Sequence, residues 1–339
     1  MSRHPWLALR VTFHEGQEDR PKRRRLALKI GLVPQTLHNP QTHGSAAARI
    51  AKAERKFDAP APLRIWHLAS FDAPTVAVVW MLAFAWAARV RLPAWIPVLL
   101  ALAAWTVYVA DRLLDASAAL RARSLLGLRE RHLFHHRHRK VLVPLALAAG
   151  CAAGCIVFTL MPAPSRERDS VLGAAALAYF TGVHSFRLPS FRGTSERGLS
   201  GNSQVIQKEL LVGLLFTSAC ALPVFSRAAV QGSLALWQLS ASTVLYALLA
   251  WLNCHAIDRW ESRPSPLESG IPPVACTLSI AGLLVACILQ PRPAALVAAG
   301  AASALLLALL DCFRGRFTPL ALRVAADLAL LTPLALLAR

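Results

Sequence analysis

The stretch WTVYVADRLLDA, residues 105–116, joins an apolar run to two aspartates that stand four residues apart. On a helix, Tyr108, Asp111 and Asp115 fall within one narrow face. Two carboxylates on one face repel each other and raise each other's pKa unless a cation lies between them. The neighbouring Arg112 could neutralise them as an interfacial salt bridge, or a bound cation could, and this stretch alone leaves both interpretations open.

The composition around this stretch is typical of a membrane protein. Hydrophobic residues make up 55% of the 339 residues and charged residues 16%, against roughly 45–50% apolar residues in soluble domains. A transmembrane helix needs about 20 apolar residues, and about nine segments come near that length. They are residues 71–90, 93–110, 141–161, 170–185, 208–225, 233–254, 272–290, 293–311 and 319–338.

The formal net charge of +19 has two interpretations. Clustered Lys and Arg attract nucleic-acid phosphates, but most of the 37 Lys and Arg residues here fall on one side of the expected helices. This asymmetry indicates a cytoplasmic amino terminus by the positive-inside rule. We therefore expect an integral protein of a bacterial inner membrane, with no nucleic-acid partner and with Asp111 and Asp115 on the cytoplasmic side.

Two domains of different character are expected. Residues 1–62 carry PKRRR and scattered polar residues, which predicts a basic, disordered cytoplasmic tail or an over-long start to the reading frame. Residues 63–339 form the polytopic membrane domain. The seven cysteines contain no CxxC pair and are interpreted as small buried hydrophobic residues.

A second stretch resembles the first. AWLNCHAIDRWES, residues 250–262, again ends an apolar helix on the cytoplasmic side and again contains Asp-Arg, here Asp258 and Arg259, followed by Glu261. Weak internal symmetry of this kind suggests two related bundles with a site where they meet. We therefore predict an all-α protein of about nine transmembrane helices, with helices two to five and six to nine as related four-helix halves and a peripheral first helix.

Acidic helix ends facing a cavity suit Mg²⁺, which takes oxygen ligands and bridges carboxylates to substrate phosphates. Cationic side chains expected at the same surface could grip a diphosphate: Arg112, Arg187, Arg192, Lys208 and Arg259. Aromatic side chains expected inside the bundle could stabilise a carbocation, although packing in the core or at the lipid interface is the simpler reading for each: Trp105, Tyr108, Tyr179, Phe180, Tyr246 and Trp251.

At this point residues 65–338 resemble the UbiA superfamily of intramembrane prenyltransferases. Asp111 and Asp115 match the two aspartates of its N-x-x-x-D-x-x-x-D motif, and VHSFRLPSFRG (183–193) with KELLVGLLFTSACALPVF (208–225) is similar to its stretch between helices four and five. The resemblance implies Mg²⁺-dependent transfer of a prenyl group from a polyprenyl diphosphate to an unidentified acceptor. It also implies that Asp111, Asp115 and Asp258 are metal ligands, with Glu261 beside them.

The chain departs from the family pattern in three places. Val107 stands where the first motif has asparagine, the second motif keeps only Asp258 followed by Glu261, and His184 stands where the family has tyrosine. These departures leave open a catalytically silent or altered relative that binds an isoprenoid or another lipid. A transporter is a further alternative, because intramembrane acids and repeats also serve transport.

Histidines give a rival hypothesis. RHLFHHRHRK, residues 131–140, has the spacing of one histidine box of membrane di-iron desaturases and hydroxylases, but His67, His184 and His255 are solitary in the sequence. Two irons need more imidazole ligands than this. We expect instead a basic amphipathic loop helix that lies on anionic headgroups or caps the cavity.

Two more charged positions lie near the carboxyl end. Arg323 and Asp327 are four residues apart within the expected ninth helix, which favours a structural ion pair between them because charges are costly there unless paired. Asp311 ends the expected eighth helix and is predicted to be solvated.

Overall fold

The computed structural model describes residues 56–121, 130–185, 200–262 and 270–338, with 121, 183–185, 200–208 and 262 described by their backbone alone. Contacts divide the chain into residues 1–53 and residues 54–339. The second unit holds all described residues. Its contacts begin before residue 63, because the backbone of Phe57 pairs with Arg316 and Thr318.

The described chain is built from helices, and its one β-type contact is the isolated bridge between Phe57 and Phe317. The helices are α2 (Ala61–Leu68), α3 (Asp72–Ala87), α4 (Trp95–Arg121), α5 (Glu130–Arg137), α6 (Arg139–Thr159), α7 (Ala163–Ser185), α8 (Ser200–Ala228), α9 (Ser233–Ser262), α10 (Ile271–Ala286), α11 (Pro291–Cys312), α12 (Pro319–Ala329) and α13 (Leu334–Leu337). Two 3₁₀ turns, η3 (Ala229–Gln231) and η5 (Arg314–Arg316), precede α9 and α12.

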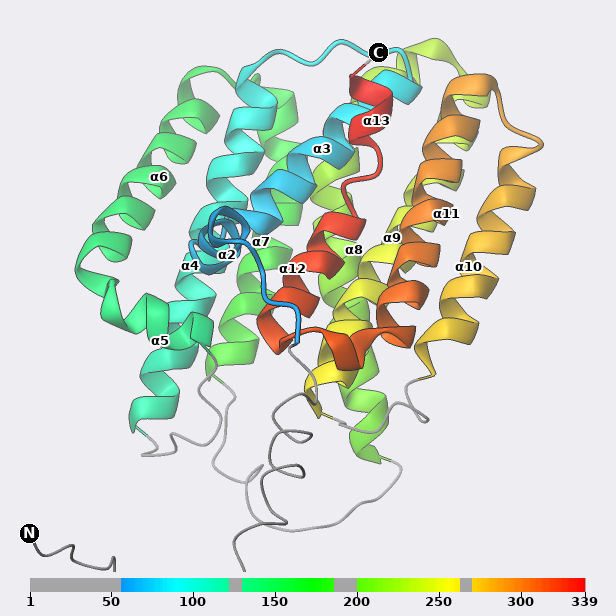
Figure 1. The fold of residues 1–339 in the computed structure, drawn as a ribbon. Helices are drawn as coiled ribbons and strands as arrows, with labels where there is room; N and C mark the ends of the chain where they lie inside the picture. The colour runs from blue at the N-terminus through cyan, green and yellow to red at the C-terminus, as the bar shows by residue number, and fades with distance from the viewer. Residues whose placement is uncertain (1–55, 122–129, 186–199, 263–269, 339) are drawn as a thin grey trace, which may run out of the picture. The chain divides into compact units, whose positions relative to one another are not determined.

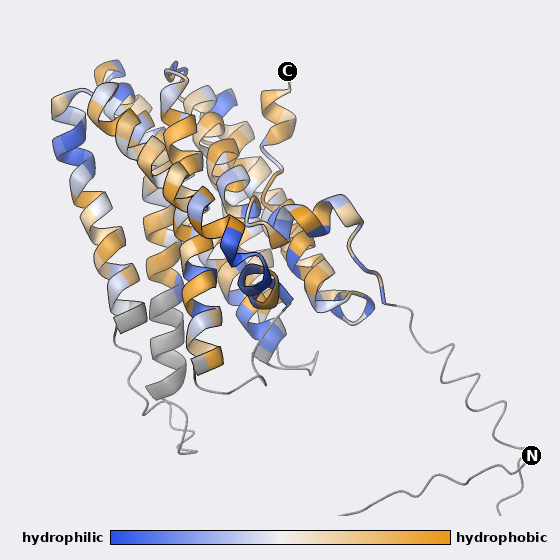
Figure 2. Cartoon of the chain, turned by 90° about the vertical axis from the view of Figure 1, so that its left-hand side faces the viewer, coloured by the Kyte–Doolittle hydropathy of each residue, from blue (hydrophilic) through white to orange (hydrophobic). Residues whose placement is uncertain are grey.

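The predicted all-α class is confirmed, and each of the nine predicted ranges contains helix. Five helices of the described chain are long and apolar enough to cross a membrane: α4, α6, α8, α9 and α11. A sixth span results if α2 and α3, which meet at a bend of 89°, are counted together. Hydrophobic residues dominate the long helices (Figure 2), as expected of a membrane protein.

The predicted helix ends were less accurate than the helices themselves. Helix α4 continues past residue 110 to Arg121 and α9 past residue 254 to Ser262, so both acidic motifs lie within helix. The predicted ninth helix is broken into α12 and α13. The carbonyl of Leu330 at this break accepts a hydrogen bond of 2.8 Å from the indole of Trp80 on α3.

The first predicted helix is central, which corrects its expected place at the periphery. Helix α3 packs against α4, α8, α11 and α12. Its Trp80 and Phe84 are fully buried, and Trp80 stacks on Tyr246 of α9 with 3.9 Å between ring centroids. A helix that is apolar all round has no face suited to water, and its many alanines permit close approach on every side. The core of the unit therefore forms around α3.

The ends of the helices form two groups within this unit (Figure 1). The carboxyl ends of α4, α7 and α9 and the amino ends of α8, α10 and α12 lie on one side. The carboxyl end of α3 and the amino ends of α9 and α11 lie on the opposite side. Because α4 and α9 end on the same side, the two acidic motifs lie at one end of the bundle.

Candidate functional site

The site is built around the break between α2 and α3. Ser70 adopts φ of 63°, a left-handed conformation that usually favours glycine. The amide of Phe71 then bonds the carbonyl of Trp66 at 3.0 Å, which ends α2 and turns the chain into α3. Asp72 begins α3, where a negative charge interacts favourably with the helix dipole.

Helix α4 supplies the side chains that satisfy the end of α2. The guanidinium of Arg112 donates to the carbonyl of His67 at 2.8 Å, and the indole of Trp105 donates to the carbonyl of Ala69 at 2.9 Å. The carbonyl of His67 also accepts from the amide of Ser70 at 3.1 Å, so it has both a backbone and a side-chain donor. Arg112 and Trp105, expected in the site for diphosphate and prenyl contacts, are therefore both engaged in holding the break.

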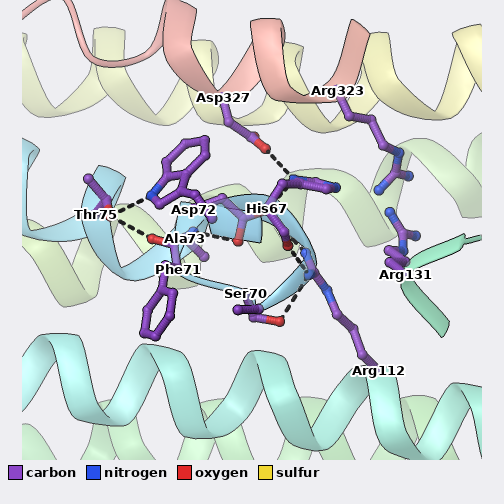
Figure 3. Close-up of polar contacts among 12 residues, drawn as sticks. His67, Ser70, Phe71, Asp72, Ala73, Thr75, Arg112, Arg131, Arg323 and Asp327 are labelled. Carbon is purple, nitrogen blue, oxygen red and sulfur yellow. Dashed lines mark hydrogen bonds and ion pairs between the residues drawn. The ribbon is translucent and has the colours of Figure 1, made fainter. Parts of the chain in front are cut away.

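A buried polar network continues from Arg112 (Figure 3). Its guanidinium also donates to Ser70 Oγ at 2.9 Å and to Asp72 Oδ2 at 3.1 Å. His67 lies between two acids, with Nδ1 2.7 Å from Asp72 Oδ2 and 3.2 Å from Asp327 Oδ2. Residues of α2, α3, α4 and α12 thus meet at one point, where each charge has an opposite partner.

Helix α5 closes the network from the other side. His135 is fully buried, and its Nε2 lies 3.1 Å from Ser70 Oγ while its Nδ1 lies 2.8 Å from the carbonyl of Arg131. A carbonyl only accepts, so Nδ1 carries the proton and Nε2 accepts from the Ser70 hydroxyl. Burial, with a smaller contribution from the nearby Arg112, lowers the pKa of His135 to about 4, although the Arg131 carbonyl opposes the shift. The imidazole is therefore neutral.

A small cavity lies beside this network. Its volume is about 60 Å³, and its polar lining comes from Asp72, Tyr108, Asn253, Cys254 and Asp327. Asn253 is buried, and its Oδ1 has no hydrogen-bond partner within the described residues. Helices α3, α4, α8, α9 and α12 all contribute to the wall. Tyr108 therefore lines a cavity, as predicted for the prenyl site, although the cavity is small.

Helices α8 and α9 approach closely at this wall. A Cβ built on Gly213 of α8 would lie 3.0 Å from the backbone nitrogen of Trp251 on α9. Because that contact is with backbone, a larger residue at 213 would push the helices apart. Gly213 therefore sets the width of the cavity on this side.

His67, Asp72 and Asp327 could hold a metal ion, because one ligand atom from each lies within 4.8 Å of the others. A nitrogen and two carboxylates suit a divalent ion such as Zn²⁺ or Mn²⁺. The guanidinium of Arg112 already supplies a cation to Asp72, however, and both of these side chains are buried. We assign this cluster a structural role.

The structure corrects three expectations about charged residues. Asp327 contacts His67, and Arg323 pairs with Glu261, so each finds its partner on another helix. His67 is not solitary but central to the network. Asp311, predicted to be solvated, is buried and accepts a hydrogen bond of 2.7 Å from the indole of Trp260.

The predicted acids of the first motif are half-buried on α4. Asp115 Oδ2 lies 4.0 Å from Nε2 of the buried His132 on α5. Tyr179, predicted for the prenyl site, is half-buried on α7.

The second motif is bordered by its own polar contacts. His255 Nδ1 lies 2.7 Å from the buried Glu209 of α8, and its ring stacks on Trp251 at 5.5 Å between centroids. Asp258 and Arg259 are half-buried one turn further on. His255 therefore links α9 to α8 below the predicted prenyl-site residue Trp251.

Three predicted phosphate-binding residues have no described side chain. Arg187 and Arg192 lie outside the described residues, and Lys208 is described by its backbone alone, on α8. Their predicted roles stay predictions.

Comparisons with protein-family models, with curated proteins and with solved structures find no match for this chain.

Proposed function

We propose that this chain is a Mg²⁺-dependent membrane prenyltransferase, which transfers a prenyl group from an isoprenoid diphosphate to an acceptor. The observation that carries the proposal is that α4 and α9, two long apolar helices, bring their acidic motifs to the same end of the bundle (Figure 1). Asp115 follows Asp111 by one turn on α4, and Asp258 lies near the end of α9. Helix α7, which carries Tyr179, also ends on this side.

In this proposal the bundle has nine spans, with the amino terminus in the cytoplasm of a bacterium. The first half comprises α4, α6, α7 and α8, and the second comprises α9, α10, α11 and the broken pair α12 and α13. Packing of α4 on α6, of α7 on α8 and of α10 on α11 supports this grouping. Helix α3 lies between the halves.

Asp111, Asp115 and Asp258 would hold Mg²⁺, which neutralises the charge of a departing diphosphate. Their donor set fits this ion, because all ligands are carboxylate oxygens of half-buried side chains on α4 and α9. Glu261 would contribute less directly, since its carboxylate pairs with Arg323.

Other side chains of the protein would bind the diphosphate and stabilise the carbocation. Arg259, with Arg187, Arg192 and Lys208, would bind the diphosphate oxygens. Ionisation breaks the allylic C–O bond, and the acceptor then bonds to the allylic carbon and loses its proton. Aromatic faces at Tyr108, Tyr179 and Trp251 would shelter the cation until the acceptor attacks. Arg112 would act as a positioning residue, because its guanidinium is committed to the α2–α3 break.

The cavity beside Tyr108 would receive the first part of the prenyl chain. Its volume of about 60 Å³ suits a few atoms, so a longer chain requires α8 and α9 to separate or the tail to extend into lipid. Gly213 has no side chain, so it adds no side-chain contact that would have to break when α8 and α9 separate. Substrate length is then set by how far this wall opens.

The test is binding of a polyprenyl diphosphate panel to the purified full-length protein with and without Mg²⁺, with diphosphate release followed in the same samples. Asp111→Asn and Asp258→Asn should each abolish both Mg²⁺-dependent binding and release. Asp169→Asn is the matched control, because Asp169 pairs with Arg168 in the first half of α7 and away from the acidic motifs.

Two outcomes would count against the proposal. Binding without release, even with membrane extract as an acceptor source, would indicate a protein that binds isoprenoids without the reaction. No Mg²⁺-dependent binding at all would overturn the assignment of Asp111, Asp115 and Asp258 as metal ligands.

A further inference from the structure

A larger cavity lies at the other end of α3, away from the acidic motifs. Its volume is about 210 Å³. The wall comes from the carboxyl end of α3, from η3 and the first turns of α9, and from the start of α11. These helix ends lie on the same side of the unit (Figure 1). The cavity therefore opens at the end of the bundle opposite to the proposed catalytic acids.

The polar groups of this wall are suited to an anion. Arg89 is the one charged residue that lines the cavity, and the other polar lining residues are Gln231, Gln238, Ser242 and Gln290. None of the lining residues is acidic. A ligand with several acceptor oxygens and a negative charge would match one cation and a set of side-chain amide donors, whereas the Ser242 hydroxyl donates to the Gln238 carbonyl.

Gln238 is the strongest indication of a ligand. It lies on α9, lines the cavity and is 5% exposed. Its side-chain amide makes no hydrogen bond within the described part of the chain, where its backbone carbonyl accepts from Ser242. The residue is buried and its amide is left to the cavity, where a ligand or water can complete its hydrogen bonds.

One helix start adds to the positive potential. Leu234 and Ala235, in the first turn of α9, line the cavity, and this turn has no acidic residue. The free amides at the start of a long helix favour an anion. Helix α11 adds little, because Pro291 and Pro293 in its first turn have no N–H.

The opposing end of α3 contributes a weakened negative potential, because three of its last four carbonyls accept hydrogen bonds. The carbonyl of Phe84 accepts from Ala88, that of Ala85 from Val90, and that of Trp86 from the guanidinium of Arg292. Arg292 also lies over the Trp86 ring, 5.4 Å from its centroid. This contact joins the start of α11 to the end of α3 at the cavity.

Arg89 occupies a position where the backbone favours glycine. Its φ of 54° is left-handed, and it follows the last turn of α3 as a capping residue. A residue with a Cβ costs free energy in this conformation relative to glycine. We therefore attribute the presence of an arginine at this position to a role of its side chain, since Arg89 lines the cavity.

We propose that this cavity binds a phosphate group, with Arg89 as its cation and with Gln238 and the amino end of α9 as its hydrogen-bond donors. The ligand is a phosphate ester of a lipid headgroup or a free phosphate, since both carry the same oxygens and charge. The site is independent of prenyl transfer, because it shares no residue with the acidic motifs.

The experiment measures binding to the purified full-length protein by calorimetry, with dihexanoyl phosphatidylglycerol, dihexanoyl phosphatidylcholine and inorganic phosphate as separate probes. Binding of phosphatidylglycerol alone identifies a lipid headgroup, and binding of inorganic phosphate identifies the free ion. Either result supports the site if it depends on Arg89. Asp111→Asn should leave this binding unchanged, which separates it from failure of the prenyltransferase proposal.

Arg89→Gly is the decisive variant. Glycine adopts the same backbone without strain, so the protein should fold at least as well while binding weakens by about tenfold or more. Gln238→Leu should weaken binding by a smaller factor. Arg91→Gln removes the same charge from a residue outside the lining and should change binding little. No binding of any probe, or equal losses in Arg89→Gly and Arg91→Gln, would overturn the proposal.

Discussion

A residue other than glycine with a left-handed backbone lies at each end of α3, but the side chains of these two residues have different surroundings. Ser70 precedes the helix and Arg89 follows it, and both adopt a left-handed conformation without being glycine. At the Ser70 end the hydroxyl accepts from Arg112 and contacts His135, and all three residues are buried. At the Arg89 end the side chains line an open cavity of about 210 Å³. A strained residue whose side chain is fully bonded within the protein serves the fold, whereas one that faces a cavity suits a ligand.

The largest effect is expected at the Ser70 end. Arg112→Met leaves Asp72 buried with His67 as its remaining partner and removes the cap on α2, and breaking a buried charge pair costs about 3–5 kcal/mol. Unfolding of the purified protein in mixed micelles with increasing denaturing detergent measures this loss. The double variant Arg112→Met with Asp72→Asn should recover part of it. If the double variant is no more stable than the single one, the pair is not the source of the effect.

The next effect depends on pH and concerns His135, which faces Arg112 of α4, Asp72 of α3 and Arg131 of its own helix. Its pKa of about 4 lies below the usual 6.5, so the unfolded chain binds the proton first as the pH falls. Stability is therefore full above about pH 6.5 and declines towards pH 4, by a loss on the order of 2 kcal/mol. Thermal unfolding across this range measures it.

His135→Gln is the control for this prediction. Glutamine can accept from Ser70 but does not titrate, so the decline should flatten between about pH 4 and 6.5. An unchanged pH profile in this variant would assign the decline to other groups.

A smaller loss is expected for Ser70→Gly. The substitution relieves the left-handed backbone but removes the hydroxyl that joins Arg112 to His135, and the lost hydrogen bonds should outweigh the relief by about 1 kcal/mol. Ser70→Ala loses the hydroxyl without the relief and should be less stable than Ser70→Gly. The same detergent titration ranks the three proteins.

The smallest expected effect is an increase in stability rather than a loss. Arg89→Gly relieves the same conformation without removing a buried hydrogen bond, and should raise stability by about 0.5–1 kcal/mol. If Arg89→Gly destabilises the protein as much as Ser70→Gly does, the contrast between the two ends of α3 is wrong. Measuring both variants in the same buffer without phosphate makes the comparison direct.

Much of the helical arrangement could be predicted from local pattern, because apolar length and helical periodicity are properties of short segments. The nine ranges contain helix, and Asp111 and Asp115 lie on one helix as expected. The start of a helix at residue 71 was predicted, but α2 before it and the bend of 89° between the two helices were not. This bend depends on α4 and α5 side chains that reach it across the fold.

The buried network was missed for the same reason. His67 has no polar periodicity around it, and its partner Asp327 has Arg323 one turn away as a more obvious neighbour. Whether Asp327 contacts His67 or Arg323 is decided by the packing of α12 against α2 and α3. The central place of α3 could not be predicted either. Its sequence is uniformly apolar, and this pattern fits a helix that faces lipid as well as a helix in the core.

The contact between His67 and Asp327 joins a helix that is made early in synthesis to a helix that is made late. Helices α2 and α3 leave the ribosome early, and α12 leaves near the end, so His67 and Asp72 wait without their third partner while the intervening helices enter the membrane. A chain interrupted before α12 would keep this polar group open within its apolar surroundings. The polar group at the bend between α2 and α3 therefore gains its last acidic partner only after α12 has been made.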